Sequence, residues 1–260
     1  TDRNDLELAL SVADAADAYT LPHFTARDFT VDWKTNATEV TEIDRGAESL
    51  IVDALTSARP DHGVFGEEHG IAGNADSDWR WVIDPIDGTS GFVRGIPVWA
   101  TLIALTHQDV PLLGVVTAPA LGFRWWGGAG IGAHVATRGA TRQMSVSTVA
   151  DVSEAQASIT HSSGWDDLGL TDRLVVLQQR ARRSRGMGDF WQHMLVAEGA
   201  MDIAVDAVGV APYDLAAVKP IVEAAGGTFT DRLGEATHQH DTAISTNGLL
   251  HAEVIAALAP

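Results

Sequence analysis

The fold is decided by the stretch Trp81-Val82-Ile83-Asp84-Pro85-Ile86-Asp87-Gly88-Thr89, an apolar run that ends in two aspartates. Pro85 biases the residue before it towards an extended backbone, so the strand is predicted to end at Asp84 and a turn to bring Asp87 back beside it. Gly88 has no Cβ, and a helix that begins at Thr89 would offer free N–H groups to a phosphate. Carboxylates are the ligands that Mg²⁺ prefers, although a plain Asp-Pro-x-Asp-Gly turn explains this segment equally well.

Further acidic residues lie on either side of this stretch. Gly66-Glu67-Glu68 follows the apolar stub Val64-Phe65. A solvated loop is the usual explanation for two adjacent acids, but both motifs lie at predicted strand ends, so Glu67 is predicted to share a cation with Asp84. Asp214 opens an apolar helix, and from the residues alone it is better explained as an acid favoured by the helix dipole.

Length and charge limit the classes of partner. The chain has 260 residues, of which 45% are hydrophobic and 20% charged, enough for one large domain or two modest ones. Its formal net charge of −18 repels polyanions, so nucleic acid is not expected as a partner. The sequence has no apolar run of the ~18 residues that a membrane span needs, so no membrane partner is expected. It has no cysteine, which excludes disulfides and fits a cytoplasmic protein.

Hydrophobic periodicity predicts two different patterns of secondary structure along the chain. Helices are predicted at 6–19, ended or bent by Pro22, and at 44–57, and short apolar segments between 64 and 126 predict an antiparallel sheet of hairpins. Later segments alternate between strand and helix, including one helix over 213–225. We therefore expect an α+β half over residues 1–139 that holds the metal ligands and an α/β half over 140–260 with the substrate-side residues, joined as one compact unit.

Three motifs, in the same order and at compatible spacing, resemble the inositol monophosphatase family of Mg²⁺-dependent phosphatases. They are Gly66-Glu67-Glu68, Asp84-Pro85-Ile86-Asp87-Gly88-Thr89 and Tyr213-Asp214-Leu215-Ala216-Ala217. The resemblance covers nearly the whole chain. It implies a layered α-β-α-β-α sandwich with the active site between the two halves, two or three Mg²⁺ per active site, a small phosphate monoester as substrate, and a homodimer.

The resemblance also implies a set of metal ligands at the matching positions. One Mg²⁺ would be bound by Glu67, Asp84 and the backbone carbonyl of Ile86. A second would be bound by Asp84, Asp87 and Asp214, which makes Asp84 the bridging ligand. Glu67 would also contact a weaker third ion.

Catalytic and phosphate-binding residues are implied in the same way. Asp44, which matches the family's Thr-x-x-Asp segment, would hydrogen-bond Thr89, and the pair would position a Mg²⁺-activated water in line with the P–O bond. The backbone around Gly88, Thr89 and Ser90 would bind the phosphoryl oxygens. Lys34 matches a lysine near this site. Family members often have asparagine one residue after Ser90, where this chain has glycine, and this difference should affect substrate fit rather than metal loading.

The segment before Phe190 matches the part of the family's pocket that faces the leaving group. Asp189 occupies a position that is small and neutral or hydroxylated in inositol-type members, and a cationic leaving group would gain a charge-assisted hydrogen bond there. This segment resembles the histidinol-phosphate phosphatase branch. Asp206 would be a second acidic contact, and Arg185 would support the pocket or a subunit interface. An N-cap role for Asp189 explains that residue equally well.

The resemblance implies Mg²⁺-dependent hydrolysis of L-histidinol phosphate to L-histidinol and phosphate, a step of histidine biosynthesis. Two alternatives remain open. One is an inositol monophosphatase with broad tolerance for sugar phosphates, and the other is a family member with an added regulatory role in binding another protein.

Overall fold

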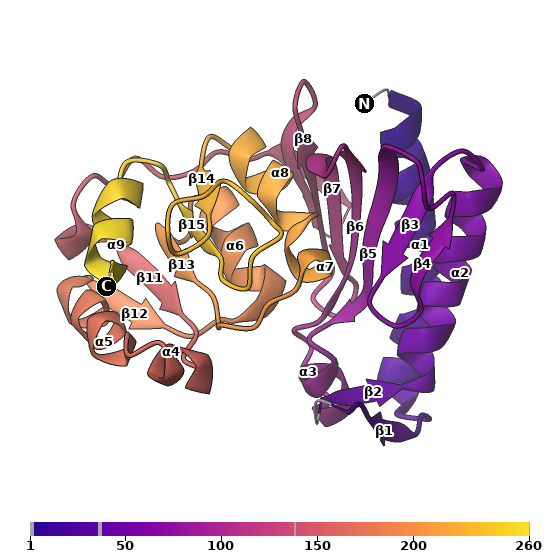
Figure 1. Cartoon of the computed structure of the whole chain (residues 1–260), viewed down its shortest axis with the longest axis horizontal. Coiled ribbons are helices and arrows are strands. Elements are labelled where there is room, and N and C mark those ends of the chain that lie inside the picture. The colour runs from indigo at the N-terminus through magenta and orange to yellow at the C-terminus, as the bar shows by residue number, and fades with distance from the viewer. Residues whose placement is uncertain (1–2, 36–37, 138, 260) are drawn as a thin grey trace.

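The computed structural model describes residues 3–35, 38–137 and 139–259. Helix and sheet layers alternate across the molecule (Figure 1): α1 and α2, a large sheet, the layer of α6–α8, a small sheet, and the outer helices α4, α5 and α9. This is the α-β-α-β-α sandwich, so the predicted fold class is confirmed. The helices are α1 (Arg3–Ala26), α2 (Glu42–Ala58), α3 (Thr89–Arg94), α4 (Ser163–Asp167), α5 (Thr171–Arg180), α6 (Asp189–Ala197), α7 (Pro212–Leu215), α8 (Val218–Ala224) and α9 (His251–Leu258), with a 3₁₀ turn, η1, at Val152–Glu154.

The large sheet has eight strands in the order β10-β9-β8-β7-β6-β5-β3-β4. Its pairs are antiparallel as predicted, except that β3 and β5 run parallel. The sheet extends past residue 139, because β10 continues the hairpin from β9. The strands are β3 (Gly63–Gly66), β4 (Gly70–Gly73), β5 (Trp79–Asp87), β6 (Ala100–His107), β7 (Val110–Ala118), β8 (Phe123–Gly128), β9 (Gly132–Thr137) and β10 (Ala140–Gln143).

The small sheet has five strands in the order β12-β11-β13-β15-β14, and β11 runs parallel to both of its neighbours. The carboxyl ends of β11, β12 and β13 therefore lie at one edge of this sheet. A separate hairpin of β1 and β2 lies beside α3 at the bottom of the view (Figure 1). The strands are β1 (Val31–Trp33), β2 (Glu39–Thr41), β11 (Gln156–Ile159), β12 (Arg183–Arg185), β13 (Ile203–Val205), β14 (Thr228–Thr230) and β15 (Ile244–Thr246).

Both faces of the large sheet are buried, and alternation along β5 assigns each side chain to one of them. Trp81 and Ile83 pack in the cluster that includes residues of α1 and α2. Val82 packs in the cluster that includes residues of α6 and α8. Asp84 is next on the side of Val82, so its carboxylate is directed towards the second half of the chain. No helix in the described part of the chain is both long and apolar enough to cross a membrane.

Two helix predictions need correction. Helix α1 does not end at Pro22 but runs on to Ala26, and Phe24 packs against Trp99 with ring centroids 5.3 Å apart. Such packing offsets the backbone hydrogen bond that proline cannot donate. The helix predicted over 213–225 is two helices, α7 and α8, and the break places Pro220 in the first turn of α8, where no intrahelical N–H bond is required.

Candidate active site

Strand β5 directs two carboxylates to the same face because its pairing is irregular between them. Residues three apart in a regular strand point to opposite faces. Between Asp84 and Asp87 the register against β6 shifts, so that an extra residue is accommodated and the alternation is reversed. Thr101 stabilises the irregularity, since its hydroxyl donates to the Pro85 carbonyl at 2.8 Å. The prediction that the strand ends at Asp84 is therefore wrong, because the ladder resumes after this bulge and β5 continues to Asp87.

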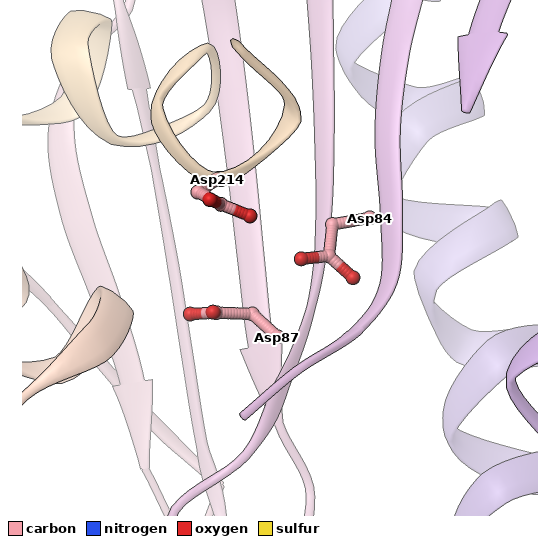
Figure 2. A group of neighbouring side chains, drawn as sticks. All are labelled: Asp84, Asp87 and Asp214. Atoms are coloured by element: carbon pink, nitrogen blue, oxygen red, sulfur yellow. The ribbon is translucent and has the colours of Figure 1, made fainter. Parts of the chain in front are cut away.

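Asp84, Asp87 and Asp214 form one carboxylate cluster. Each offers an oxygen within 4.8 Å of the others. Their carboxylates converge on one space, with Asp84 and Asp87 carried by β5 and Asp214 by α7 (Figure 2). Asp84 and Asp87 are buried, and the Asp84 Oδ1 atom accepts a hydrogen bond from the Ile86 N–H at 2.9 Å. The structure therefore brings Asp214 together with two acids that lie much earlier in the sequence.

Backbone amides of the second half hold the other two carboxylates in place. The Phe190 N–H donates to Asp87 Oδ2 at 2.8 Å, which joins the start of α6 to β5. The Ala211 N–H donates to Asp214 Oδ2 at 2.7 Å. Each aspartate keeps further lone pairs that face the shared space.

Burial and mutual repulsion destabilise the ionised form of the three carboxylates when no cation is bound. Burial, followed by the charges of Glu67, Asp87 and Asp214, raises the pKa of Asp84 well above its usual range. Burial and the charges of Asp189 and Asp214 do the same to the pKa of Asp87. Burial, with the charges of Glu67 and Asp206, raises the pKa of Asp214 to about 7. Hard oxygen ligands with excess negative charge are suited to divalent cations, so the residues present fit Mg²⁺.

These shifts predict how the metal-free protein responds to pH. The Asp214 pKa is about 7 in the folded chain against an ordinary value of 3.8, so the folded state binds this proton more tightly than the unfolded state. Stability should therefore be lost as pH rises between these two values. We expect the melting temperature in chelator to fall between pH 5 and pH 7.5, and excess Mg²⁺ to abolish the fall. Asp214→Asn should show a smaller fall in chelator, and an identical fall would contradict this assignment.

Glu67 lies at the rim of the cluster on a backbone segment that a buried glutamate supports. Lys34 Nζ contacts Glu67 Oε1 at 2.7 Å, which places this lysine at the site as predicted. Glu48 of α2 is fully buried and accepts hydrogen bonds from the N–H groups of Glu68 and His69 at 2.8 and 2.7 Å. The sequence interpretation missed Glu48. Its position one helical turn after Asp44 was the available signal, since the two residues share a helix face.

Asp44 and Thr89 are hydrogen-bonded, as predicted. Thr89 Oγ1 lies 2.9 Å from Asp44 Oδ1 and 2.9 Å from the carbonyl oxygen of Ile86. Thr41 caps α2 and contacts Asp44 Oδ2 through both its N–H at 2.8 Å and its hydroxyl at 2.5 Å. Burial raises the pKa of Asp44, and the bonds from Thr41 and Thr89 oppose that shift. Asp44 is therefore fixed in orientation behind the threonine hydroxyl.

A cleft of about 270 Å³ lies over the cluster and is lined by residues from both halves of the chain. Gly88 has a φ of 86° and precedes α3, which begins at Thr89 as predicted. Ser90 also lines the cleft, and its hydroxyl accepts a hydrogen bond from Arg94. The lining residues are Thr38, Glu39, Glu67, Asp84, Ile86, Asp87, Gly88, Thr89, Ser90, Gly209, Ala211, Tyr213 and Asp214.

Asp189 lies beside this cleft and does not cap its helix. Its Oδ2 atom is 3.5 Å from the point where a Cβ on Gly88 would be. Gly188 is the N-cap residue of α6 and no side chain caps this end, so the N-cap explanation of Asp189 is wrong. Burial and the charge of Asp206 raise the pKa of Asp189 to about 6. Asp189 is exposed to solvent, which screens part of the repulsion from Asp206.

Asp206 and Arg185 lie outside the set of described residues that line the cleft. Asp206 follows β13, is 5% exposed, and is hydrogen-bonded to a buried histidine, His193. Arg185 is exposed at the end of the edge strand β12. The substrate contacts predicted for these two residues stay predictions. The sequence interpretation also missed His193, which lies one helical turn after Asp189 on α6.

Comparison with known proteins agrees with this geometry. Residues 3–260 match the model of the inositol monophosphatase family. A histidinol-phosphatase of Mycobacterium tuberculosis is 46% identical over 98% of each chain, and one of Streptomyces coelicolor is 44% identical over 98% of this chain and 97% of that protein. The solved structure of an IMPase from Thermotoga maritima has a TM-score of 0.86 at 31% identity and covers 98% of this chain and 96% of its own. The resemblance inferred from the three motifs is confirmed, and the chain belongs to the inositol monophosphatase family.

Proposed function

We propose that this protein is a Mg²⁺-dependent phosphomonoesterase that hydrolyses L-histidinol phosphate to L-histidinol and phosphate. The observation that carries the proposal is the convergence of Asp84, Asp87 and Asp214 beside Asp189. The first three acids suit cations that neutralise a phosphate. The fourth offers an anion on the side where a leaving group with an ammonium or imidazolium would lie. The histidinol-phosphatases at 46% and 44% identity support this choice of substrate.

The metal ligands proposed are Glu67, Asp84 and the Ile86 carbonyl for one ion, and Asp84, Asp87 and Asp214 for another. A weaker third ion is proposed at Glu67. Bound Mg²⁺ supplies positive charge to the phosphoryl oxygens and makes water a better nucleophile at neutral pH. The raised pKa values of the three clustered aspartates support this assignment. The buried carboxylates repel one another, and a bound cation would offset that repulsion.

The protein groups that act on the substrate are proposed as follows. Gly88, Thr89 and Ser90 line the cleft at the start of α3, and their N–H groups would bind phosphoryl oxygens. Thr89 and Asp44 form the hydrogen-bonded pair that orients the attacking water, with Asp44 as the acceptor that draws the proton through the threonine hydroxyl. No covalent phosphoenzyme is required.

The direct test is phosphate release by the purified protein on L-histidinol phosphate and inositol 1-phosphate, with Mg²⁺ and with chelator. We expect Mg²⁺-dependent turnover with a strong preference for histidinol phosphate. A preference for inositol 1-phosphate would overturn the substrate assignment and favour the inositol monophosphatase alternative. Equal activity with chelator and with Mg²⁺ would overturn the metal mechanism.

Asp44→Asn should lower kcat by about 100-fold, a typical loss when a group that assists proton transfer is removed. The Mg²⁺ concentration for half-maximal activity should stay within about threefold of wild type, because the nearest contacts of Asp44 are Thr41 and Thr89 rather than the carboxylate cluster. Steady-state kinetics over a Mg²⁺ titration measures both quantities. A large shift in Mg²⁺ affinity would instead make Asp44 a ligand.

We further propose a cytoplasmic homodimer, by analogy with the family. Light scattering after gel filtration tests the dimer, and a monomer at micromolar concentration would contradict it. An added protein-binding role is the second alternative. Retention of a partner by Asp84→Asn protein in a pull-down, without turnover, would favour that role.

A further inference from the structure

A buried polar chain lies behind the acidic side of the cleft. His193 of α6 is 1% exposed, and its Nε2 atom lies 3.0 Å from Asp206 Oδ2. Its Nδ1 atom lies 2.8 Å from the hydroxyl of Ser245 on β15, which is fully buried. The three side chains thus connect β15, α6 and the end of β13 in one line.

The chemistry of the three groups sets the direction of both hydrogen bonds. An ionised carboxylate only accepts, so Nε2 carries the proton that is shared with Asp206. In a neutral ring Nδ1 is then the acceptor, and the Ser245 hydroxyl donates to it. Asp206 Oδ1 accepts a further bond from the Ala207 N–H at 2.8 Å. One donor on each oxygen fixes the plane of the Asp206 carboxylate.

Asp206 lies close to the reaction site although it does not line the cleft. His193 is one turn after Asp189 on α6, so the helix that begins with Asp189 also carries the residue that holds Asp206. The Asp206 charge is among the causes that raise the pKa of Asp189. A fixed negative charge at this position attracts a cationic group bound at Asp189 and gives little to a neutral polyol.

We infer that His193 is a positioning residue for substrate selection, which holds the Asp206 carboxylate so that its charge favours a phosphate ester with a cationic leaving group. Ser245 holds His193 in the tautomer that this requires. The inference rests on the proposed function, since it concerns how the same site selects histidinol phosphate. What it adds to that function is a buried residue, His193, that influences the choice of substrate without contacting the substrate.

Kinetics of two variants test the inference. His193→Leu removes the donor at similar volume, whereas His193→Gln can still donate an N–H to Asp206. We expect His193→Leu to raise KM for histidinol phosphate about tenfold, with kcat within about twofold and KM for inositol 1-phosphate unchanged. His193→Gln should stay within about threefold of wild type. Equal losses on both substrates, or equal losses in both variants, would overturn the role of His193.

A matched control separates this role from a loss of packing. His251 is half-buried in the same half of the chain and contacts two hydroxyls, Thr230 Oγ1 at 2.9 Å and Thr246 Oγ1 at 3.1 Å. His251→Leu should lower the melting temperature and leave the ratio of the two KM values unchanged. If it changes the ratio as much as His193→Leu does, the role assigned to His193 is wrong.

The ring nitrogens provide a readout that needs no substrate. Nitrogen-15 NMR of wild type should show His193 with the proton on Nε2, and Ser245→Ala should increase the share of the other tautomer. A wild-type proton on Nδ1 alone would overturn the inference. If wild type hydrolyses inositol 1-phosphate in preference to histidinol phosphate, the proposed function fails and the selection role fails with it. If wild type prefers histidinol phosphate and only the His193 variants behave otherwise than expected, the proposed function survives.

Discussion

Asp84→Asn should lower kcat for phosphate ester hydrolysis by at least about 1,000-fold, the scale expected when charge stabilisation at the reacting group is lost. Asp84 lies in both proposed ion sites, so the substitution weakens two sites at once. Asparagine keeps the shape of the side chain, and its oxygen can still accept the 2.9 Å bond from the Ile86 N–H. The fold should therefore persist, and the melting temperature in chelator should rise, because a buried carboxylate with a strongly raised pKa has been removed.

Kinetics at saturating Mg²⁺ and calorimetric titration of Mg²⁺ measure the two consequences of this substitution. Asp61→Asn is the matched control, since Asp61 is an exposed acid of the same half and lies outside the cleft lining. It should match wild type in both measurements. Near-normal turnover of Asp84→Asn at saturating Mg²⁺ would exclude a bridging role.

Asp189→Asn should lower kcat/KM for histidinol phosphate by about 30-fold or more and change inositol 1-phosphate by less than about threefold. Hydrogen bonds to charged groups contribute about 1.5–3 kcal/mol, and every 1.4 kcal/mol is a factor of ten. The cationic leaving group loses such a bond, whereas a polyol can still hydrogen-bond the amide. The ratio of the two kcat/KM values is the quantity to measure.

The backbone at Asp189 decides which replacement gives a clean result. Its φ is 50°, in the left-handed region, which asparagine tolerates better than alanine or threonine does. In Asp189→Ala, added backbone strain and loss of charge would both change activity and could not be separated. Asp189→Gly removes the charge and also relieves the strain. The asparagine and glycine variants should therefore share the same loss of selectivity. Equal losses on the two substrates would rule out Asp189 as a cation contact.

The sequence was sufficient to predict the site wherever ligands and turns lie in short motifs. Asp84, Asp87 and Thr89 share one segment, and the helix beginning at Thr89 follows from Gly88. The layered fold and the Asp44–Thr89 bond were also predicted, through the family resemblance, and both are present. Such features depend on nearby residues or on motifs that keep their order.

The sequence was insufficient to predict features that depend on tertiary contacts. Helix α1 passes Pro22 because packing in the folded chain outweighs a local stop signal. Glu48 and His193 have hydrogen-bond partners 20 and 13 residues away along the chain, and the contact of His193 with Ser245 spans 52 residues, so no local pattern indicates these partners. The pairing irregularity in β5 depends on β6, and single-strand alternation would have placed Asp87 on the wrong face.

That irregularity makes the site depend on how the backbone of β5 pairs with β6 as well as on which side chains it carries. If this segment paired regularly with β6 at its present length, the two acids would diverge, because they lie three residues apart, while the sheet and its core would keep their composition. A lineage could lose catalysis by a change that removes the bulge, such as loss of the Thr101 bond to the Pro85 carbonyl, and still retain a folded protein, with every acid of the cluster encoded in its gene.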